Sequence, residues 1–234
     1  LEYIQHIVQS GENLIKLIND IIDISKIESN QLSIEVSPGK LNDVLDQLYN
    51  RFEEILVIEN NSEINLKLDK AFPAADFTIL FDNYRIQQVL SYLLTNAIKF
   101  TPKGIITFGY NVENSEVRFF VKDQGIGIPE NKKDLIFKSF GKLEGTQRMN
   151  KSGTGLGLSI SKSLVELMGG KIWFETEENV GTNFFFTIPL EFTKQKPSET
   201  LETLPQYDKE STKTSCKKIL IAEDEMLNYK LLES

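Results

Sequence analysis

The spacing of apolar residues predicts one long helix at the start of the chain. Over residues 1–29, apolar side chains recur every three or four positions, and a second apolar column repeats every seven. Such a broad stripe is typical of helical bundles and coiled coils. An isolated helix of this kind is marginal in water, so we expect it to pair with another helix in a dimer. Packing on the core of its own domain is the alternative.

After this helix, the pattern switches between the period of two typical of strands and the period of 3.6 typical of helices. Alternation predicts strands at 32–36, 64–68, 78–81, 105–112, 116–123, 171–177 and 182–190. Helical spacing predicts helices at 41–56, 83–100 and 156–168, with a short helix around 135–140. This order fits an open α/β sheet with its helices segregated to one side.

Local signals place the ends of several elements. Asp82 suits the N-cap of the helix that follows it, and Gly169-Gly170 suits a helix C-terminus. Pro38-Gly39 predicts a turn, and residues 113–115 predict the turn of a hairpin. The polar stretch 141–152 is longer than most connections, which favours a functional lid.

The C-terminal part of the chain changes character. Residues 193–216 are polar, with two prolines and many charged and hydroxyl side chains, which is typical of a linker. Residues 217–222, KKILIA, then predict a compact buried strand, followed by the start of a helix up to Ser234. We interpret residues 217–234 as the beginning of a further α/β domain, and the whole sequence as a piece of a longer chain.

Composition excludes some classes of function. The formal net charge of −8 argues against a protein that wraps duplex nucleic acid, because phosphate neutralisation needs clustered Lys and Arg. No apolar run approaches the roughly 20 residues of a membrane span, so we expect no direct membrane contact from this sequence. The single cysteine, Cys216, cannot form an internal disulfide and fits a reducing compartment.

Two glycine-rich turns carry the strongest chemical signal. The first, with Gly125 and Gly127, follows an apolar strand that ends at Asp123, and the second, at residues 153–157, precedes an apolar helix. Glycines let backbone N–H groups approach a phosphate closely, and a helix N-terminus favours negative charge. A carboxylate at the bottom of a pocket can accept a hydrogen bond from an exocyclic amine such as that of adenine. The two turns therefore predict one nucleotide held from two sides.

Two polar residues near the end of the helix at 83–100 need an explanation. Asn96 lies at the edge of the buried stripe, where a polar amide needs a partner. Taken alone, it fits a cap or a surface amide, and Lys99 alone fits a solvated cation at a helix end. The roles of Asn96 and Lys99 therefore depend on which other residues lie near the end of this helix.

Together these motifs resemble the sequence boxes of hybrid sensor histidine kinases. LLTNAIKFT resembles their N box, DQGIGIP the G1 box, IFKSF the F box and GTGLGLS the G2 box. GTNFFFTIPL resembles the last hairpin of the catalytic domain. Upstream, LINDIIDISKIES is similar to the second helix of the dimerisation domain, and downstream KKILIAEDE is similar to the start of a receiver.

The resemblance implies an architecture and a set of ligands. It implies a two-layer α/β sandwich of the Bergerat type, with part of the dimerisation domain at 1–30, the ATP-binding catalytic domain at 31–192, a linker at 193–216 and a truncated receiver at 217–234. ATP and Mg²⁺ would be the ligands, a homodimer would form through the first helix, and a receiver would be the partner. The intact protein would be anchored in the inner membrane with this part in the cytoplasm.

By position, the resemblance also implies roles for individual residues. Asn96 would bind Mg²⁺, Lys99 would approach the phosphates, Asp123 would bind the adenine amino group and Thr182 would lie at the pocket floor. The remaining ATP-binding residues would be Phe100, Gly125, Ile126, Gly127, Ile128, Gly153, Thr154, Gly155, Leu156, Gly157 and Leu158. Glu223 and Asp224 would match the acidic pair of a receiver.

Three departures from the family pattern matter. The family often has a second asparagine four residues before Asn96, but this chain has Tyr92 there. The F-box loop reads FKSFGKLEG, without the proline and glutamine that are common there. The only histidine, His6, lies in the first predicted helix without the acceptor motif, so we interpret it as an ordinary helix residue. The sequence thus predicts nucleotide binding without autophosphorylation of this segment.

Two other functions remain as alternatives, and one fold is disfavoured. A docking module with a degenerate nucleotide pocket is suggested by Tyr92. An ATPase of the gyrase, mismatch-repair or chaperone type would need a glutamate on the N-box helix, yet no acidic residue lies between Asp82 and Asn96. A dinucleotide-binding fold is disfavoured because GTGLGL has the wrong glycine spacing and does not directly follow a strand.

Overall fold

The computed structural model describes residues 2–58, 61–72, 78–138 and 155–192. In this part of the chain, a five-stranded sheet has the order β2-β4-β5-β7-β6. Its strands are β2 (Ile64–Lys70), β4 (Gly104–Glu113), β5 (Glu116–Asp123), β7 (Gly181–Pro189) and β6 (Ile172–Glu177). β2 runs parallel to β4 and the other neighbours are antiparallel, so the sheet is mixed.

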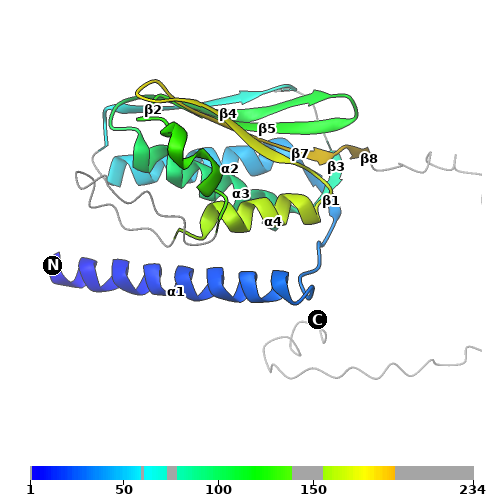
Figure 1. Ribbon diagram of the computed structural model, residues 1–234, viewed down its shortest axis with the longest axis horizontal. Coiled ribbons are helices and arrows are strands. Elements are labelled where there is room, and N and C mark those ends of the chain that lie inside the picture. Colours follow the sequence, from blue (N-terminus) through cyan, green and yellow to red (C-terminus); the bar gives the residue numbers. More distant parts are fainter. Residues whose placement is uncertain (1, 59–60, 73–77, 139–154, 193–234) are drawn as a thin grey trace, which may run out of the picture. The chain divides into compact units, whose positions relative to one another are not determined.

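Three helices form a layer on one face of this sheet (Figure 1). They are α2 (Leu41–Ile58), α3 (Asn83–Phe100) and α4 (Gly157–Leu167). The core lies between the two layers, where Phe108, Tyr110, Phe119 and Phe186 are fully buried from the sheet side. The rings of Phe119 and Phe186 stack with their centroids 4.5 Å apart. The predicted α/β sandwich with helices on one side is therefore confirmed.

A small second sheet has the order β1-β3-β8, with β1 at Ser37–Lys40, β3 at Thr78–Phe81 and β8 at Glu191–Phe192. The sequence did not predict this sheet, and the predicted strand at 32–36 is wrong because that segment has no regular structure. The turn predicted at Pro38-Gly39 is wrong as well, because both residues lie in the edge strand β1, the kind of strand that tolerates proline.

The other corrections are small. The short helix expected around 135–140 is a 3₁₀ helix at Glu130–Leu135, earlier in the chain. Both predicted hairpins are confirmed, and the β4–β5 turn has Asn114 and Ser115 at φ of 52° and 62°. The predicted lid at 141–152, the linker and the receiver segment with Glu223 and Asp224 lie outside the described residues.

Asp82 is the N-cap of α3, as predicted. One carboxylate oxygen accepts a hydrogen bond from the Arg85 backbone N–H at 3.0 Å, which satisfies a donor at the helix start. The other oxygen accepts from the Glu35 backbone N–H at 2.8 Å. The same side chain therefore ties the segment after α1 to the start of α3.

The long helix α1 spans Glu2–Glu28. Near its C-terminal end, Ile24 and Ile27 pack against the domain core. Further along its described part, six apolar side chains are at least one-third exposed: Leu14, Ile15, Leu17, Ile18, Ile21 and Ile22. Most of the described stripe is thus not covered by this domain, whereas the C-terminal end of the helix packs on it. No helix in the described ranges is long and apolar enough to cross a membrane.

Candidate functional site

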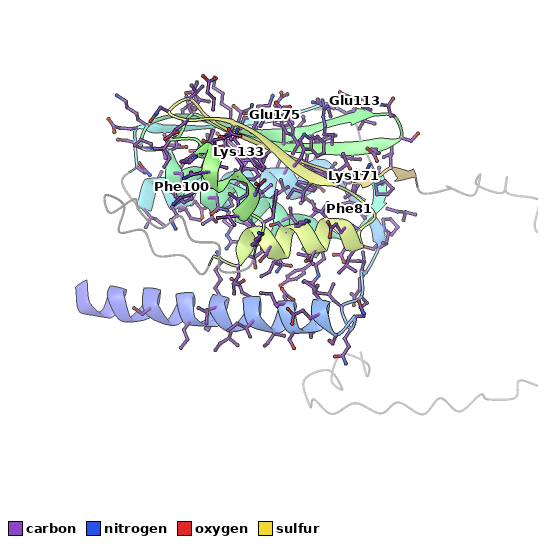
Figure 2. All side chains as sticks on the ribbon, in the orientation of Figure 1. Phe81, Phe100, Glu113, Lys133, Lys171 and Glu175 are labelled. Carbon is purple, nitrogen blue, oxygen red and sulfur yellow. The ribbon has the colours of Figure 1, made fainter. Side chains whose placement is uncertain are left out.

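The C-terminal end of α3 meets the first glycine turn. The Ile126 backbone N–H donates to the carbonyl oxygen of Phe100 at 3.2 Å, and Figure 2 labels Phe100 at this helix end. A Cβ added at Gly125 would lie only 2.4 Å from the same carbonyl oxygen. Only glycine permits such a close approach of two backbone segments. The first glycine turn is therefore held beside the helix that carries Asn96 and Lys99.

The same turn is also fastened to the β6–β7 hairpin. The Asn179 backbone N–H donates to the Ile126 carbonyl at 2.8 Å, and the Ile128 N–H donates to Thr176 Oγ1 at 2.9 Å. Gly127 has a φ of +67°, and a Cβ there would lie 2.2 Å from the Glu177 carbonyl oxygen. The turn is thus fixed from both sides before any ligand binds.

Asp123 lies at the end of β5, directly opposite Thr182 of β7. Its Oδ1 accepts hydrogen bonds from the backbone N–H of Gly125 at 2.9 Å and of Thr182 at 3.2 Å. Burial raises the pKa of this carboxyl, and the two N–H donors partly oppose the rise. Since both of these bonds end on Oδ1, the geometry leaves Oδ2 as an acceptor for a polar ligand group such as an amine.

Thr176 is a site residue that sequence reasoning missed. Its Oγ1 lies 3.0 Å from Thr182 Oγ1, donates to the Gly181 carbonyl at 3.0 Å and accepts from Ile128 N–H. The signal was present in the sequence, because Thr176 and Thr182 are placed symmetrically about the hairpin turn and pair across it. This hydroxyl pair links Thr182, beside Asp123, to the first glycine turn.

On α3, Asn96 and Lys99 lie within one turn of the end of the helix. Asn96 is half-buried, and the Lys99 ammonium lies 5.1 Å from the centroid of the Phe100 ring. Tyr92 precedes Asn96 by four residues and so lies on the same helix face. Tyr92 is only 8% exposed, because its ring packs between α3, α1 and the start of α4.

The second glycine turn leads into α4. Gly155 has a φ of +74°, and Leu156 is buried. A Cβ at Gly157 would lie 2.7 Å from Cδ1 of Tyr92, so the start of α4 rests on α3. Leu156, the N-cap residue of α4, makes no side-chain cap hydrogen bond, and a helix N-terminus is suited to a phosphate. Leu158 packs on the core, whereas Gly153 and Thr154 lie outside the described residues.

The predicted residues that the structure describes therefore gather at adjoining elements. The first glycine turn contacts the end of α3, and the start of α4 contacts α3 one turn before Asn96. No cluster of three or more His, Cys, Asp or Glu suited to a metal is found within the described ranges. Among the described residues near this helix end, the Asn96 amide oxygen is of the donor type that Mg²⁺ accepts.

A hollow of about 410 Å³ at the β6–β7 turn is lined in part by Asp123 and Thr176. Figure 2 labels Glu175, one of its lining residues, and Glu177 is another. Neither Asn96 nor the start of α4 lines this hollow. Its carboxylates would repel a triphosphate, so the hollow is a poor candidate for the phosphate site.

Comparison with known proteins shows which family the chain resembles. Residues 81–192 match the family described as histidine kinase-, DNA gyrase B- and HSP90-like ATPases. The circadian input-output histidine kinase CikA of Synechococcus elongatus is 38% identical over 208 residues, which are 88% of this chain and 27% of CikA. The chain spans about a quarter of the length of the curated relatives that it matches first.

Two solved structures are also similar. The catalytic domain of the histidine kinase ThkA has 36% identity and a TM-score of 0.55, and the match covers 66% of this chain and 95% of that domain. ThkA has also been solved in complex with the response regulator protein TrrA. Full-length ShkA in complex with AMPPNP has 26% identity and a TM-score of 0.68, covering 82% of this chain and 39% of ShkA.

The fold and these matches define the class. The chain belongs to the family of histidine kinase-, DNA gyrase B- and HSP90-like ATPases. Within that family, its relatives are histidine kinases, and the domain is an ATP-binding catalytic domain of that type.

Proposed function

We propose that ATP binds where α3, the first glycine turn and the start of α4 meet, and that this domain transfers its γ-phosphoryl group to a histidine. The observation that supports this proposal most strongly is the environment of Asp123. Its carboxylate is partly buried, and its Oδ1 accepts hydrogen bonds from two backbone N–H groups. In this proposal, Oδ2 accepts a hydrogen bond from the adenine amino group. Thr182 lies beside it at the floor, and Ile126 and Ile128 flank the base.

The phosphates would then lie between α3 and α4. The N–H groups at the start of α4, from Gly155 to Leu158, would bind phosphate oxygens, and Lys99 would add a positive charge. Gly153 and Thr154 would continue this phosphate contact. When bound, Mg²⁺ would neutralise phosphate charge, with Asn96 as a ligand. Phosphoryl transfer depends mostly on such positioning and charge stabilisation, which this chain's residues are suited to supply.

The test is a calorimetric titration of the chain with the non-hydrolysable analogue AMPPNP, with and without Mg²⁺. We expect saturable binding of one nucleotide per chain that strengthens when Mg²⁺ is present. The competing function is a docking module with a degenerate pocket, which the engagement of Tyr92 by α1 favours. Absence of binding at millimolar nucleotide would support the docking module instead.

The wider assignment is also a proposal. We infer that the chain is part of a hybrid sensor histidine kinase, with domain limits at 1–30, 31–192, 193–216 and 217–234. A receiver aspartate would be the final phosphate acceptor, by analogy with the partner of ThkA. His6 lies in α1, but its side chain is outside the described residues. Radiolabelled ATP should leave no stable phosphate on it.

We further propose that two copies of the chain pair through the exposed apolar stripe of α1. Ile18 is 47% exposed on this stripe. Ile18→Ala is expected to weaken self-association by about 150-fold, because each of the two copies loses roughly 1.5 kcal/mol of apolar burial, which is about 3 kcal/mol per dimer. Sedimentation equilibrium measures this change. Val57→Ala is the matched control, since Val57 is 73% exposed on α2. An unchanged dissociation constant for Ile18→Ala would contradict the proposed interface.

A further inference from the structure

Two carboxylates of α1 are buried against α3. Asp20 is 2% exposed and Asp23 is 9% exposed. Asp23 accepts hydrogen bonds from Arg85 Nη1 at 3.3 Å and from Gln88 Nε2 at 2.6 Å. Asp20 accepts from the Tyr92 hydroxyl at 2.5 Å. Burying a carboxylate is costly unless it is hydrogen-bonded, so these specific partners determine where α1 docks.

The three partners on α3 are spaced by three and four residues, which places them on one face of that helix. They begin one turn from the Asp82 cap and end one turn before Asn96. The polar contact therefore runs along the same helix that carries the proposed nucleotide ligands. Next to it, Ile24 and Ile27 supply the apolar part of the contact between α1 and the domain.

Tyr92 also supports the start of α4. Gly157 lies against the Tyr92 ring, because a Cβ added at Gly157 would lie only 2.7 Å from Tyr92 Cδ1. The Lys16 ammonium lies 5.4 Å from the ring centroid on the α1 side. Burial and the hydrogen bond to Asp20 raise the pKa of Tyr92, so its hydroxyl stays protonated and can donate. One side chain on α3 thus contacts both α1 and α4.

We propose that Asp20, Asp23, Arg85, Gln88 and Tyr92 form an interhelical clasp through which docking of α1 and nucleotide binding at α4 strengthen each other. The identity of the ligand rests on the proposed function. The clasp holds the Tyr92 ring in one orientation, and the ring holds the start of α4. A phosphate group then meets a helix N-terminus that is already ordered, so less free energy is lost in ordering it.

This coupling acts in both directions. If docking of α1 raises nucleotide affinity by some factor, nucleotide must strengthen docking of α1 by the same factor. The hydroxyl of Tyr92 is needed for this link, because it donates to Asp20 across the space between α3 and α1. Asparagine, which is common at this position in the family that the sequence resembles, has a shorter side chain than tyrosine. In this chain, the side chain of Tyr92 joins α1 to the catalytic domain.

The variant Tyr92→Phe tests the clasp, since it keeps the ring against Gly157 and removes only the hydroxyl. Hydrogen exchange of residues 14–28, followed by mass spectrometry, reports docking of α1 with and without AMPPNP and Mg²⁺. In the unmodified chain, we expect nucleotide to slow exchange in this segment. In Tyr92→Phe we expect about fivefold faster exchange without nucleotide and about fivefold weaker nucleotide binding.

Asp20→Asn, on the other helix, is a second variant: it keeps an acceptor oxygen for the Tyr92 hydroxyl but removes the charge that strengthens the bond, so it should give the same two changes to a smaller extent without altering any residue of the cleft. Tyr84→Phe is the matched control: Tyr84 is 67% exposed on α3, and it should behave as the unmodified chain does. Unchanged exchange in both clasp variants would overturn the clasp. Faster exchange with unchanged nucleotide affinity would overturn the coupling.

These outcomes separate the clasp from the proposed function. If the unmodified chain binds no nucleotide, the proposed function and the coupling both fail. The exchange rates of Tyr92→Phe, Asp20→Asn and Tyr84→Phe without nucleotide still decide whether the clasp docks α1.

Discussion

Replacing Asp123 by asparagine is expected to weaken ATP binding by about 100-fold while the domain remains folded. The asparagine can keep an oxygen facing the N–H groups of Gly125 and Thr182, which now donate to Asp123 Oδ1. Its amide NH₂ would then face the adenine amino group, so two donors meet and neither is satisfied. A lost hydrogen bond to a charged group costs about 1.5–3 kcal/mol, and 2.7 kcal/mol corresponds to about 100-fold. Calorimetric titration measures the loss.

The pH dependence gives a second readout of Asp123→Asn. Burial raises the pKa of Asp123, and only the ionised carboxylate accepts at both oxygens. ATP affinity should therefore fall as the pH falls through this raised pKa, and this part of the dependence should be absent in the variant. Asp134→Asn is the matched control, because Asp134 is exposed in the 3₁₀ helix. Equal affinities of Asp123→Asn and the unmodified chain would exclude the proposed adenine contact.

The raised pKa of Asp123 also affects the stability of the folded domain. Since the folded state raises this pKa, it favours the protonated carboxyl over the ionised one. The stabilising contribution is present below the pKa of the unfolded chain and is lost as the pH rises through the folded pKa. At neutral pH the ionised carboxylate therefore costs stability, and Asp123→Asn should melt at an equal or higher temperature. Loss of nucleotide binding in that variant would thus not result from unfolding.

Asn96→Ala is expected to remove most of the contribution of Mg²⁺ to nucleotide binding. With Mg²⁺ present, affinity should fall about 30-fold, or about 2 kcal/mol, because the proposed metal site loses its amide oxygen. Without Mg²⁺, the affinity should change little. Stability should not suffer, since alanine has the higher helix propensity. Paired titrations with and without Mg²⁺ measure the difference.

Asn50→Ala provides the control for this variant. Asn50 is an exposed amide within α2, so the substitution changes the same side chain in a helix away from the cleft. It should leave both affinities unaltered. An equal loss with and without Mg²⁺ in Asn96→Ala would mean that Asn96 contacts the nucleotide directly and is not a metal ligand.

Sequence reasoning succeeded where structure depends on local geometry. The Asp82 cap, the β4–β5 turn and the glycine stop after α4 follow from side-chain hydrogen bonding and φ preferences within a few residues. It failed at residues 32–36, where an alternating pattern is not matched by strand pairing: Leu32 packs on the core, but Val36 is 54% exposed. Strand pairing depends on a distant partner, here β3, which selected residues 37–40 instead.

The sequence by itself determined the class of fold and indicated most of the residues proposed for the candidate site, but not Thr176. Periodicity marked the helices and most of the strands, and the glycine turns with Asp123 and Asn96 marked the residues that could bind a nucleotide. Only the tertiary structure decided how Tyr92 is used, because its partner Asp20 is 72 residues away in the chain. The tertiary structure also raises the pKa of Asp123, because desolvation of a carboxylate depends on which strands and turns pack around it.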